Sequence, residues 1–573
     1  MKKAHDSVFT IGIGGAAGDG VRESGATIGA ILTELGYESY YSFTYPSLIR
    51  GGHNFARISF SKDSVHCDHQ ALDVLIALNE ESISLHVPEL TENSVVFGDG
   101  IKEDDLKQLG QNFQVLPMQK TVTELKAMPI MRNSMAIGAL CYLIDLDYDL
   151  MQKVLNKVFK NKQPEMNTKL ADMGYEIMKK NDYRHLKKIE PSNAKNDFLE
   201  GNVAIGKGMI YAGLDFYLGY PMTPTTSLLQ FVASQQQNSK VRVIQPESEL
   251  SVINMALGIS YAGKRVAIGS ATGGFALMQE ALSFAGIAEF PLVIVVSQRQ
   301  GPATGLPTYS SQTDLRYVLH SGHGEFPKIV IAPGDTEEGY YMGAKALNLA
   351  WKYQVPVIIL VDKIISEHSS TALLDPSKIQ IEKGKLAETG QGYERYKITE
   401  DGISPLAFPG TKDAIVKITS YEHDKDGITV EDPELTTAML NKRFKKSETI
   451  KQELDNSESI KIYGDEDASD IVVFWGSTKG PVLEAYERYL DKPVKLVQIV
   501  WLNPFPIEQL KSALKNSKNI INIECNHDAQ MAGLIREKTG IEVTHNILKY
   551  NARPFDPEEL AGEISKLLAT GSK

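Results

Sequence analysis

Apolar runs rich in valine and isoleucine alternate with amphipathic, helix-period patterns along most of the chain. The first segment predicts a strand over residues 8–13, a glycine turn, and a helix over 22–35 that Gly36 ends. Further strands are predicted over residues 74–78 and 95–97. The pattern fades near residue 180, and this part of the chain therefore predicts an α/β domain.

The middle segment alternates most regularly. Helical patterns separate its apolar runs, which lie at residues 241–244, 265–268, 292–297, 328–332 and 355–361. Strands that are apolar on both faces are typical of a parallel sheet with helices on each side. The segment therefore predicts a doubly wound parallel sheet.

A third α/β unit begins at Ile471 with the letters IVVFWG. The predicted fold class is α/β, with three α/β domains separated by polar stretches. The predicted parts are an N-terminal domain (1–180), a charged linker that contains Pro191 (181–201), the doubly wound domain (202–370), an irregular connecting region with a charged helix over 435–454 (371–466), and a C-terminal domain (467–573).

Composition narrows the classes of function. The chain has 573 residues, 42% of them hydrophobic, and a net charge of −12, which argues against nucleic-acid binding. No apolar run is long enough to cross a bilayer, and the N-terminal run reads as a strand rather than a signal peptide. We therefore expect no membrane partner.

The spacing of the cysteines indicates whether this chain holds a metal site and in which cellular compartment it works. The three cysteines lie far apart and form no CxxC motif, so we expect no disulfide framework, iron–sulfur cluster or zinc site in this chain. His66, Cys67, Asp68 and His69 are adjacent ligand types, but neighbours in sequence rarely converge on one metal. The sequence predicts no metal ligands here and a reducing cytoplasmic location.

The letters YPMTPTT, from Tyr220 onward, follow a predicted strand at residues 216–218. Thr223 is predicted as a helix N-cap and Pro224 as the first helical residue. Free backbone N–H groups would then face outward where a strand ends, a good place to hold a carboxylate. The alternative is a well-capped helix start with no ligand.

Two carboxylates, Glu247 and Glu249, follow a buried strand and begin a predicted helix. One of the two could serve only to match the helix dipole. Ala256 and Gly258 lie farther along the same helix, and a glycine inside a helix often marks close packing.

Two loops follow in order. Residues 270–275 (SATGGF) form a small-residue turn between a strand and a helix, which suits close backbone approach to a ligand. Arg299 leaves the end of a very apolar strand and precedes glycine-rich chain. Its guanidinium is suited to bind a carboxylate through two parallel hydrogen bonds. The alternative is that Arg299 is an exposed loop residue with no ligand.

In this order and spacing, YPMTP, ESE, SATGGF and QRQGPATGLPT resemble the α subunit of 2-oxoacid:ferredoxin oxidoreductases. IVVFWGSTKG and WLNPFP resemble the last domain of that subunit, while GIGGAAGDGV and YPSLIRGGHNFARIS resemble the γ domain of the same family, fused ahead of α. The sequence departs from the family at Met222, where isoleucine is common, and in SATGGF, where TSGPG is more usual.

The resemblance implies a γ-like domain, a pyrimidine-binding domain for thiamine diphosphate and a C-terminal, transketolase-C-like domain II. It implies that Glu249 is the catalytic residue and hydrogen-bonds N1′ of the aminopyrimidine. Thr223 and Arg299, with Tyr220 and Pro221, would bind the substrate. The implied cofactor-binding residues are Glu249, Pro224, Thr272, Gly273 and Gly274.

The implied reaction is oxidative decarboxylation of a 2-oxoacid, 2-oxoglutarate above others, with coenzyme A, to acyl-CoA and carbon dioxide. Electrons would pass to ferredoxin through iron–sulfur clusters on a β subunit in an (αβ)2 heterotetramer. Pyruvate or a branched-chain oxoacid remains open as substrate. The rival readings are a thiamine enzyme without ferredoxin, against which the γ-like domain speaks, and a non-catalytic assembly subunit.

Two glycine motifs are expected to be turns only. Gly12, Gly14 and Ala17 imitate a dinucleotide fingerprint, but no acidic residue closes the second strand. The GDG triplets at residues 18–20 and 98–100 lack the asparagine pair that would share Mg²⁺ with the diphosphate. The diphosphate half of the site, with its Mg²⁺, is therefore expected on the β subunit.

Overall fold

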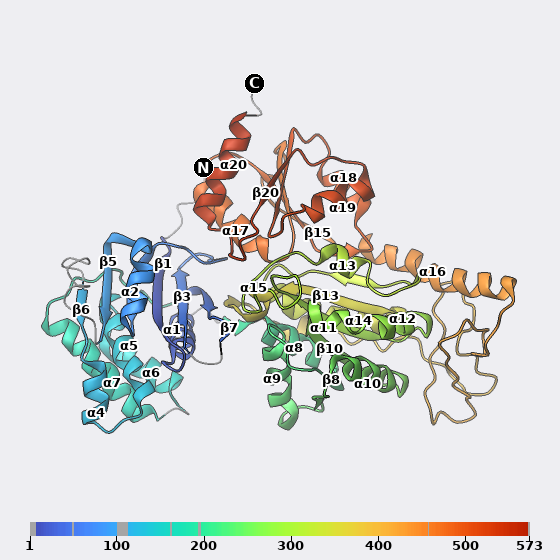
Figure 1. The fold of residues 1–573 in the computed structure, drawn as a ribbon, viewed down its shortest axis with the longest axis horizontal. Coiled ribbons are helices and arrows are strands. Elements are labelled where there is room, and N and C mark those ends of the chain that lie inside the picture. Colours follow the sequence, from blue (N-terminus) through green and yellow to red (C-terminus); the bar gives the residue numbers. More distant parts are fainter. Residues whose placement is uncertain are drawn as a thin grey trace. The chain divides into compact units, whose positions relative to one another are not determined.

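A computed structural model describes residues 7–48, 51–99, 113–160, 163–192, 196–455 and 458–570. The chain divides into two compact units, each described by itself. Unit 1 comprises Met1–Leu199 with His368–Leu373, and unit 2 comprises Glu200–Glu367 with Leu374–Lys573 (Figure 1).

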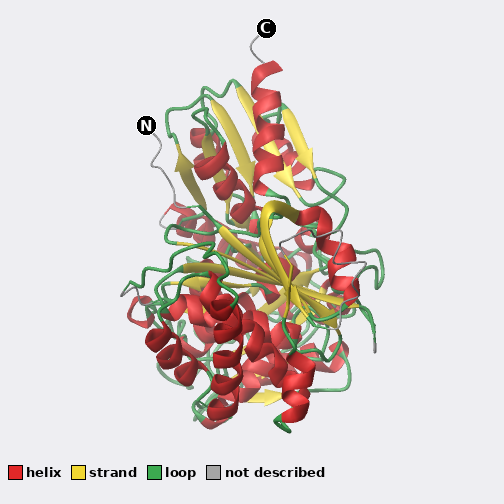
Figure 2. Cartoon of the chain, turned by 90° about the vertical axis from the view of Figure 1, so that its left-hand side faces the viewer, coloured by secondary structure: helices red, strands yellow, loops and turns green. Residues whose placement is uncertain are grey.

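Unit 1 is built on a mixed sheet whose strand order, among the described residues, is β6-β5-β4-β1-β3-β2-β14-β7. Figure 2 looks toward this unit and shows strands that fan out through their twist. The strands are β1 (Phe9–Ala16), β2 (Glu38–Thr44), β3 (His53–Ser61), β4 (Leu72–Ala77), β5 (Leu90–Gly98), β6 (Phe113–Val115), β7 (Asp197–Glu200) and β14 (Ser369–Ala372).

The helices of unit 1 include α1 (Val21–Glu34), which follows the turn after β1 and confirms the predicted strand–turn–helix start. The other helices described in this unit are α2 (Glu80–His86), α4 (Met118–Glu124), α5 (Arg132–Leu143), α6 (Tyr148–Val158) and α7 (Pro164–Lys180). Two strands of the sheet come from outside the predicted N-terminal domain, because β7 lies in the predicted linker and β14 follows the middle segment.

The central sheet of unit 2 has the order β18-β12-β13-β11-β10-β8-β9 in the described part of the chain. Every pairing in it is parallel except that of β18 with β12. Its strands are β8 (Phe216–Leu218), β9 (Arg242–Ile244), β10 (Val266–Ala271), β11 (Leu292–Gln298), β12 (Ile329–Ile331), β13 (Pro356–Asp362) and β18 (Trp501–Asn503). The predicted parallel sheet is confirmed.

Both faces of this sheet are covered, as the apolar strands predict. In β11, Ile294 and Val296 face one hydrophobic core, while Val293 and Val295 face the other. One set of helices is α8 (Gly201–Tyr211), α9 (Thr226–Ser234) and α14 (Thr336–Tyr353), and the other is α10 (Glu249–Tyr261) and α12 (Gln279–Ile287). Short helices follow strand ends at α11 (Thr272–Ala276), α13 (Leu315–Leu319) and α15 (Lys363–Glu367).

The polar connecting region is largely irregular up to the long helix α16 (Pro433–Asp455), which confirms the predicted charged helix. A third sheet follows, with the order β15-β17-β16-β19-β20 in the described residues. Its elements are β15 (Ile460–Gly464), β16 (Asp470–Phe474), β17 (Lys495–Ile499), β19 (Asn519–Glu524), β20 (His545–Leu548), α17 (Lys479–Glu484), α18 (Ile507–Ala513), α19 (Gln530–Thr539) and α20 (Pro557–Thr570).

The C-terminal segment packs into the core of the middle one. β18 extends the central sheet, with Asn503 opposite Val330 and Trp501 opposite Ile331. Trp475 is 1% exposed in the same hydrophobic cluster as residues of β10 and β11. Burial of this shared apolar surface joins the two segments into one compact unit.

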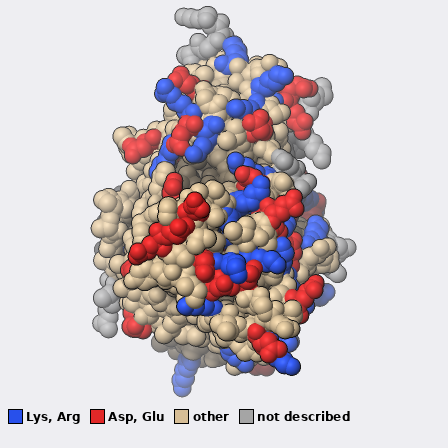
Figure 3. All heavy atoms as spheres, turned by 90° about the vertical axis from the view of Figure 1, so that its right-hand side faces the viewer, with Lys and Arg blue, Asp and Glu red and all other residues tan. Residues whose placement is uncertain are grey.

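The surface shown in Figure 3 carries lysine and arginine interspersed with aspartate and glutamate, not a field of one sign. In the described ranges, no helix is both long and apolar enough to span a bilayer. Within the same ranges, no three histidine, cysteine or carboxylate side chains are grouped as metal ligands would be.

Candidate functional site

The predicted site residues converge at one edge of the central sheet. The strands β11, β10, β8 and β9 are neighbours in that order, and all run parallel. Arg299 follows β11, Thr272 follows β10, the YPMTP loop follows β8, and Glu249 comes a few residues after β9. The carboxyl edge of an open α/β sheet is where such folds bind ligands, so the convergence defines a candidate active site.

Glu249 is the first residue of α10 and is 4% exposed. Ser248 caps the helix, because its side chain accepts a hydrogen bond from the Ser251 backbone N–H. The carboxylate oxygen Oε1 of Glu249 is buried and has no hydrogen-bond partner in the part of the chain that the structure describes. A buried acceptor without a partner costs free energy, so this oxygen requires a donor from outside the chain.

Glu247 has a different place from Glu249. Its side chain is exposed and accepts a hydrogen bond from the Ser251 hydroxyl. That hydrogen bond lowers the pKa of Glu247. The structure thus assigns the surface role to Glu247 and leaves Glu249 as the buried carboxylate.

Gly274 makes room for the Glu249 carboxylate. A methyl group at Gly274 would lie 2.5 Å from Oε1 of Glu249 and would also collide with the Ser270 hydroxyl. Ser270 is fully buried, and its hydroxyl points to the Met222 sulfur at 3.8 Å. The small residues of the SATGGF turn therefore form a cradle around the carboxylate.

Arg299 and Thr223, the two residues predicted to bind the substrate carboxylate, are in direct contact. The Arg299 Nη1 donates a hydrogen bond of 2.8 Å to the backbone carbonyl of Thr223. Burial lowers the pKa of the Arg299 guanidinium. No carboxylate in the described residues pairs with Arg299, so most of its N–H donors are left for a ligand.

The predicted helix start at Thr223 is wrong. The Thr223–Pro224 bond is cis, and the segment forms a turn in which the Thr225 N–H donates to the Met222 carbonyl at 2.9 Å. Helix α9 begins only at Thr226, so no helix N-terminus opens at Thr223. Local capping rules failed because Asn202, from α8, donates to the Pro224 carbonyl and holds the turn.

The sequence interpretation missed Asp314. The Thr272 hydroxyl donates to its Oδ2 at 2.7 Å, and the Asp314 N–H donates to the Gln298 side chain at 3.0 Å. Burial raises the pKa of Asp314, and the Thr272 hydrogen bond offsets part of that rise. The one local signal was an aspartate immediately before α13, which reads as an ordinary helix cap.

The remaining predicted residues differ in exposure. Tyr220 is 38% exposed, Pro221 and Gly273 are also exposed, and Pro224 is buried. Gly258 is exposed with nothing within 4 Å of the position a side chain would take, so the close packing expected there is absent. The space around Gly273 is likewise open, so this end of the SATGGF turn faces the surface.

Comparison with known proteins gives two matching family profiles. Residues 207–442 match the thiamine-diphosphate-binding domain of pyruvate flavodoxin/ferredoxin oxidoreductases, and residues 10–177 match the pyruvate ferredoxin/flavodoxin oxidoreductase family. The first range contains the whole of the candidate site. The second lies within unit 1.

Individual relatives are similar along nearly the whole chain or along part of it. A 2-oxoacid:ferredoxin oxidoreductase subunit alpha from Sulfolobus sp. is 32% identical, over 98% of this chain and 97% of that protein. The 2-oxoglutarate synthase subunit KorA of Methanocaldococcus jannaschii is 32% identical over 57% of this chain and 88% of that protein. A 2-oxoglutarate:ferredoxin oxidoreductase from Magnetococcus marinus, solved with 2-oxoglutarate, coenzyme A and succinyl-CoA bound, has a TM-score of 0.89 at 30% identity, covering 98% of this chain and 99% of that one.

Proposed function

Because this chain belongs to the family of 2-oxoacid:ferredoxin oxidoreductase alpha subunits, we propose that it recognises the 2-oxoacid and activates thiamine diphosphate in such an enzyme. The overall reaction is oxidative decarboxylation of the 2-oxoacid with coenzyme A, with electrons passing to ferredoxin. The observation that carries the proposal is the buried Oε1 of Glu249, which has no partner among the described residues.

The cradle fits the aminopyrimidine ring of thiamine diphosphate. A nitrogen of this ring can share a proton with a carboxylate oxygen. Oε1 of Glu249 lacks such a hydrogen-bond partner among the described residues. Gly274 leaves room for the Glu249 carboxylate itself, and the open space at Gly273 would let a flat ring approach the backbone beside Thr272, which Asp314 holds. We also assign Pro224 to the cofactor-binding residues. When bound, thiamine diphosphate supplies the nucleophilic carbon and the electron sink that decarboxylation needs.

Arg299 would bind the carboxylate of the 2-oxoacid. Its anchor on the Thr223 carbonyl fixes the guanidinium at the sheet edge and leaves a planar set of donors for two parallel hydrogen bonds. Tyr220 and Pro221, on the exposed part of the same loop, would contact the rest of the substrate. Holding the substrate in one orientation contributes to rate through proximity.

A β subunit would complete the site. The three cysteines are buried and none forms a disulfide in the described residues, and the chain has no CxxC motif, which supports a cluster on another subunit. The diphosphate and its Mg²⁺ would be held there too, in an (αβ)2 assembly that passes electrons to ferredoxin. A reducing cytoplasmic location is part of the proposal, and cysteines that form no disulfide in the described residues support it.

We propose 2-oxoglutarate as the substrate. This choice is supported by the names of the Methanocaldococcus subunit and of the Magnetococcus enzyme, both of which specify that oxoacid. Pyruvate and branched-chain 2-oxoacids are the alternatives that an assay must separate.

The test uses the full chain co-expressed with its β subunit, assayed anaerobically for viologen reduction with 2-oxoglutarate, pyruvate and 2-oxoisovalerate in turn. We expect 2-oxoglutarate to give the highest kcat/KM. Glu249→Gln should abolish turnover without affecting subunit assembly, whereas Glu247→Gln, which removes the same charge from an exposed neighbour, should not. Normal turnover in Glu249→Gln would contradict the proposed function and would favour a non-catalytic assembly subunit.

A further inference from the structure

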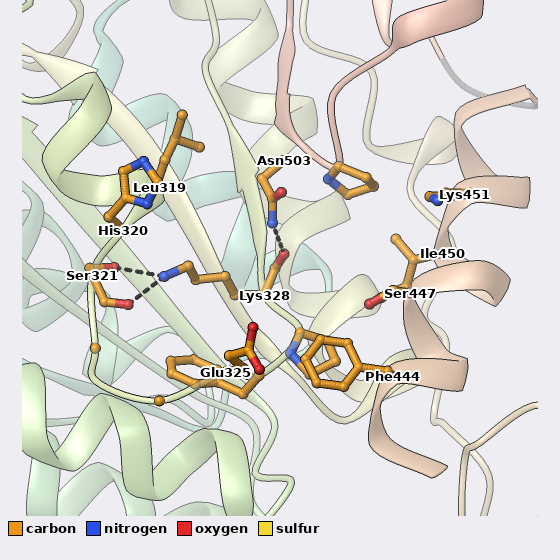
Figure 4. Close-up of a pocket in the computed structure, with 15 residues that line it drawn as sticks. Leu319, His320, Ser321, Glu325, Lys328, Phe444, Ser447, Ile450, Lys451 and Asn503 are labelled. Carbon is orange, nitrogen blue, oxygen red and sulfur yellow. Dashed lines mark hydrogen bonds between the residues drawn. The ribbon is translucent and has the colours of Figure 1, made fainter. Parts of the chain in front are cut away.

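A second pocket in unit 2, with a volume of about 380 Å³, is built from other residues than the candidate site. It lies where three segments meet: the loop that leads into β12, one side of α16, and the chain that follows β18. Figure 4 shows Lys328 between His320 and Ser321 on one side and Ser447 and Ile450 of α16 on the other.

Lys328 is a partly buried cation, and the described residues supply no counter-ion for it. Its Nζ donates to the backbone carbonyl and, at 3.3 Å, to the hydroxyl of Ser321, and it lies 5.2 Å from the centroid of the Phe326 ring. No carboxylate in the described residues pairs with it. Since an ammonium has three donors, one N–H of Lys328 has no oxygen acceptor among the described residues.

The position of this amine is fixed from both ends. The Asn503 side chain donates to the backbone carbonyl of Lys328, and the Ser321 hydroxyl, which accepts from Nζ, itself donates to the Val318 carbonyl at 2.7 Å. Burial lowers the pKa of Lys328 to about 8, because water is removed from the ammonium and no anion replaces it. An anion in the pocket would restore the missing interaction.

The walls are apolar and the rim is polar. Phe326 and Phe444, the latter 38% exposed, line the pocket together with Ile450. His320 and Lys451 lie at its exposed margin, as does Glu325, which makes no ion pair with Lys328. Rings facing a shared cavity suit the apolar body of a ligand, and a single inward cation suits one acidic group.

We propose that this pocket binds a small organic carboxylate, whose acidic group pairs with Lys328 and whose apolar body lies between Phe326 and Phe444. The carboxylate would accept the spare N–H of Lys328 in a charge-assisted hydrogen bond. The volume of about 380 Å³ lies within the range of small-molecule sites. The proposal does not depend on the function proposed for the Glu249 site.

The test is a ligand-observed NMR titration of the full chain with three probes: benzoate, benzyl alcohol as its uncharged match, and inorganic phosphate as charge without an apolar body. Titrations use an Arg299→Lys background, which removes the guanidinium fork of the candidate site as a competing carboxylate binder. We expect saturable benzoate binding, and binding at least about tenfold weaker for the alcohol and for phosphate.

Lys328→Met should weaken benzoate at least about tenfold, since methionine keeps the apolar stem but not the charge. Lys240→Met, which removes an exposed lysine of the same unit, should leave the affinity unchanged. Phe444→Ala changes a half-exposed wall residue and should weaken benzoate binding several-fold. This variant tests the proposal if Lys328→Met fails to fold.

Equal benzoate affinity in Lys328→Met and Lys240→Met would overturn the proposal. So would equal affinity for benzyl alcohol, equal affinity for phosphate, or no saturable benzoate binding in the millimolar range.

Discussion

A methyl group on Gly274 would lie 2.5 Å from the carboxylate oxygen Oε1 of Glu249, closer than van der Waals contact allows. The two residues come from different elements, α11 and α10, and meet only at the carboxyl edge of the sheet. The Glu249 carboxylate can therefore occupy this position only if residue 274 is glycine. For this reason the SATGGF turn is part of the candidate active site.

Gly274→Ala should displace the Glu249 carboxylate and abolish 2-oxoacid-dependent viologen reduction. Overpacking of this kind costs about 1–3 kcal/mol of unfolding free energy, which chemical denaturation would measure. Gly258→Ala is the matched control, because Gly258 lies exposed in α10 with nothing within 4 Å. It should stabilise the chain by about 0.5–1 kcal/mol. A Gly274→Ala enzyme with full activity would contradict this account of the cradle.

Arg299→Lys should raise KM for the 2-oxoacid about tenfold or more, because a point charge cannot replace two parallel hydrogen bonds. The thermal midpoint should change little, since Arg299 makes a single hydrogen bond, to Thr223, in the described part of the chain. Arg242→Lys, at an exposed position in β9, controls for a general effect of the exchange. An unaltered KM would show that Arg299 is only a loop residue.

Glu289→Gln should destabilise unit 2 by about 3–5 kcal/mol, because it leaves two buried lysines without a counter-charge. The Glu289 carboxylate is 1% exposed and accepts from Lys442 Nζ at 2.7 and 2.8 Å, while Lys446 Nζ lies 2.5 Å away. Burial alone would raise the pKa of Glu289, but Lys442, Lys446 and Arg395 outweigh it and hold that pKa well below its usual range.

The control for Glu289→Gln lies on the same helix. Lys445 pairs with Glu448 on the exposed side of α16, so Lys445→Met should leave the stability nearly unchanged. Urea unfolding of both variants beside the wild type measures the difference. If the two variants lose similar stability, the buried cluster does not hold the connecting region to the sheet.

The lowered pKa of Lys328 predicts that the free energy of unfolding depends on pH. Its pKa is about 8 in the folded chain, against an ordinary value of 10.5. Between these values the unfolded chain binds more protons than the folded one, so this lysine makes stability rise as pH increases through that window. Lys328→Met should flatten the rise, measured as the denaturation midpoint across the window. His320, Glu325 and Lys451 also line the pocket and remain in both proteins. An identical slope in the two proteins would contradict the prediction.

The sequence alone determined the α/β class, the doubly wound parallel sheet and the residues that gather at its edge. Strand runs such as those of β11 and β13 are apolar up to their last one or two residues because helices cover both faces, and that pattern is local. Since parallel strands end at the same edge, the loops holding Thr223, Glu249 and Arg299 had to lie near one another.

Only the tertiary structure decided which groups are buried and which contacts form. Glu247 and Glu249 are indistinguishable by pattern, yet Gly274 and Ser270 enclose only the second. Asp314 reaches Thr272 across 42 residues of chain, and Asn202 donates to the Pro224 carbonyl in the turn that stands where local capping rules predict a helix start. Each outcome depends on contacts between segments that are distant in the sequence. Such contacts do not change the periodic pattern of hydrophobic residues, so the sequence does not reveal them.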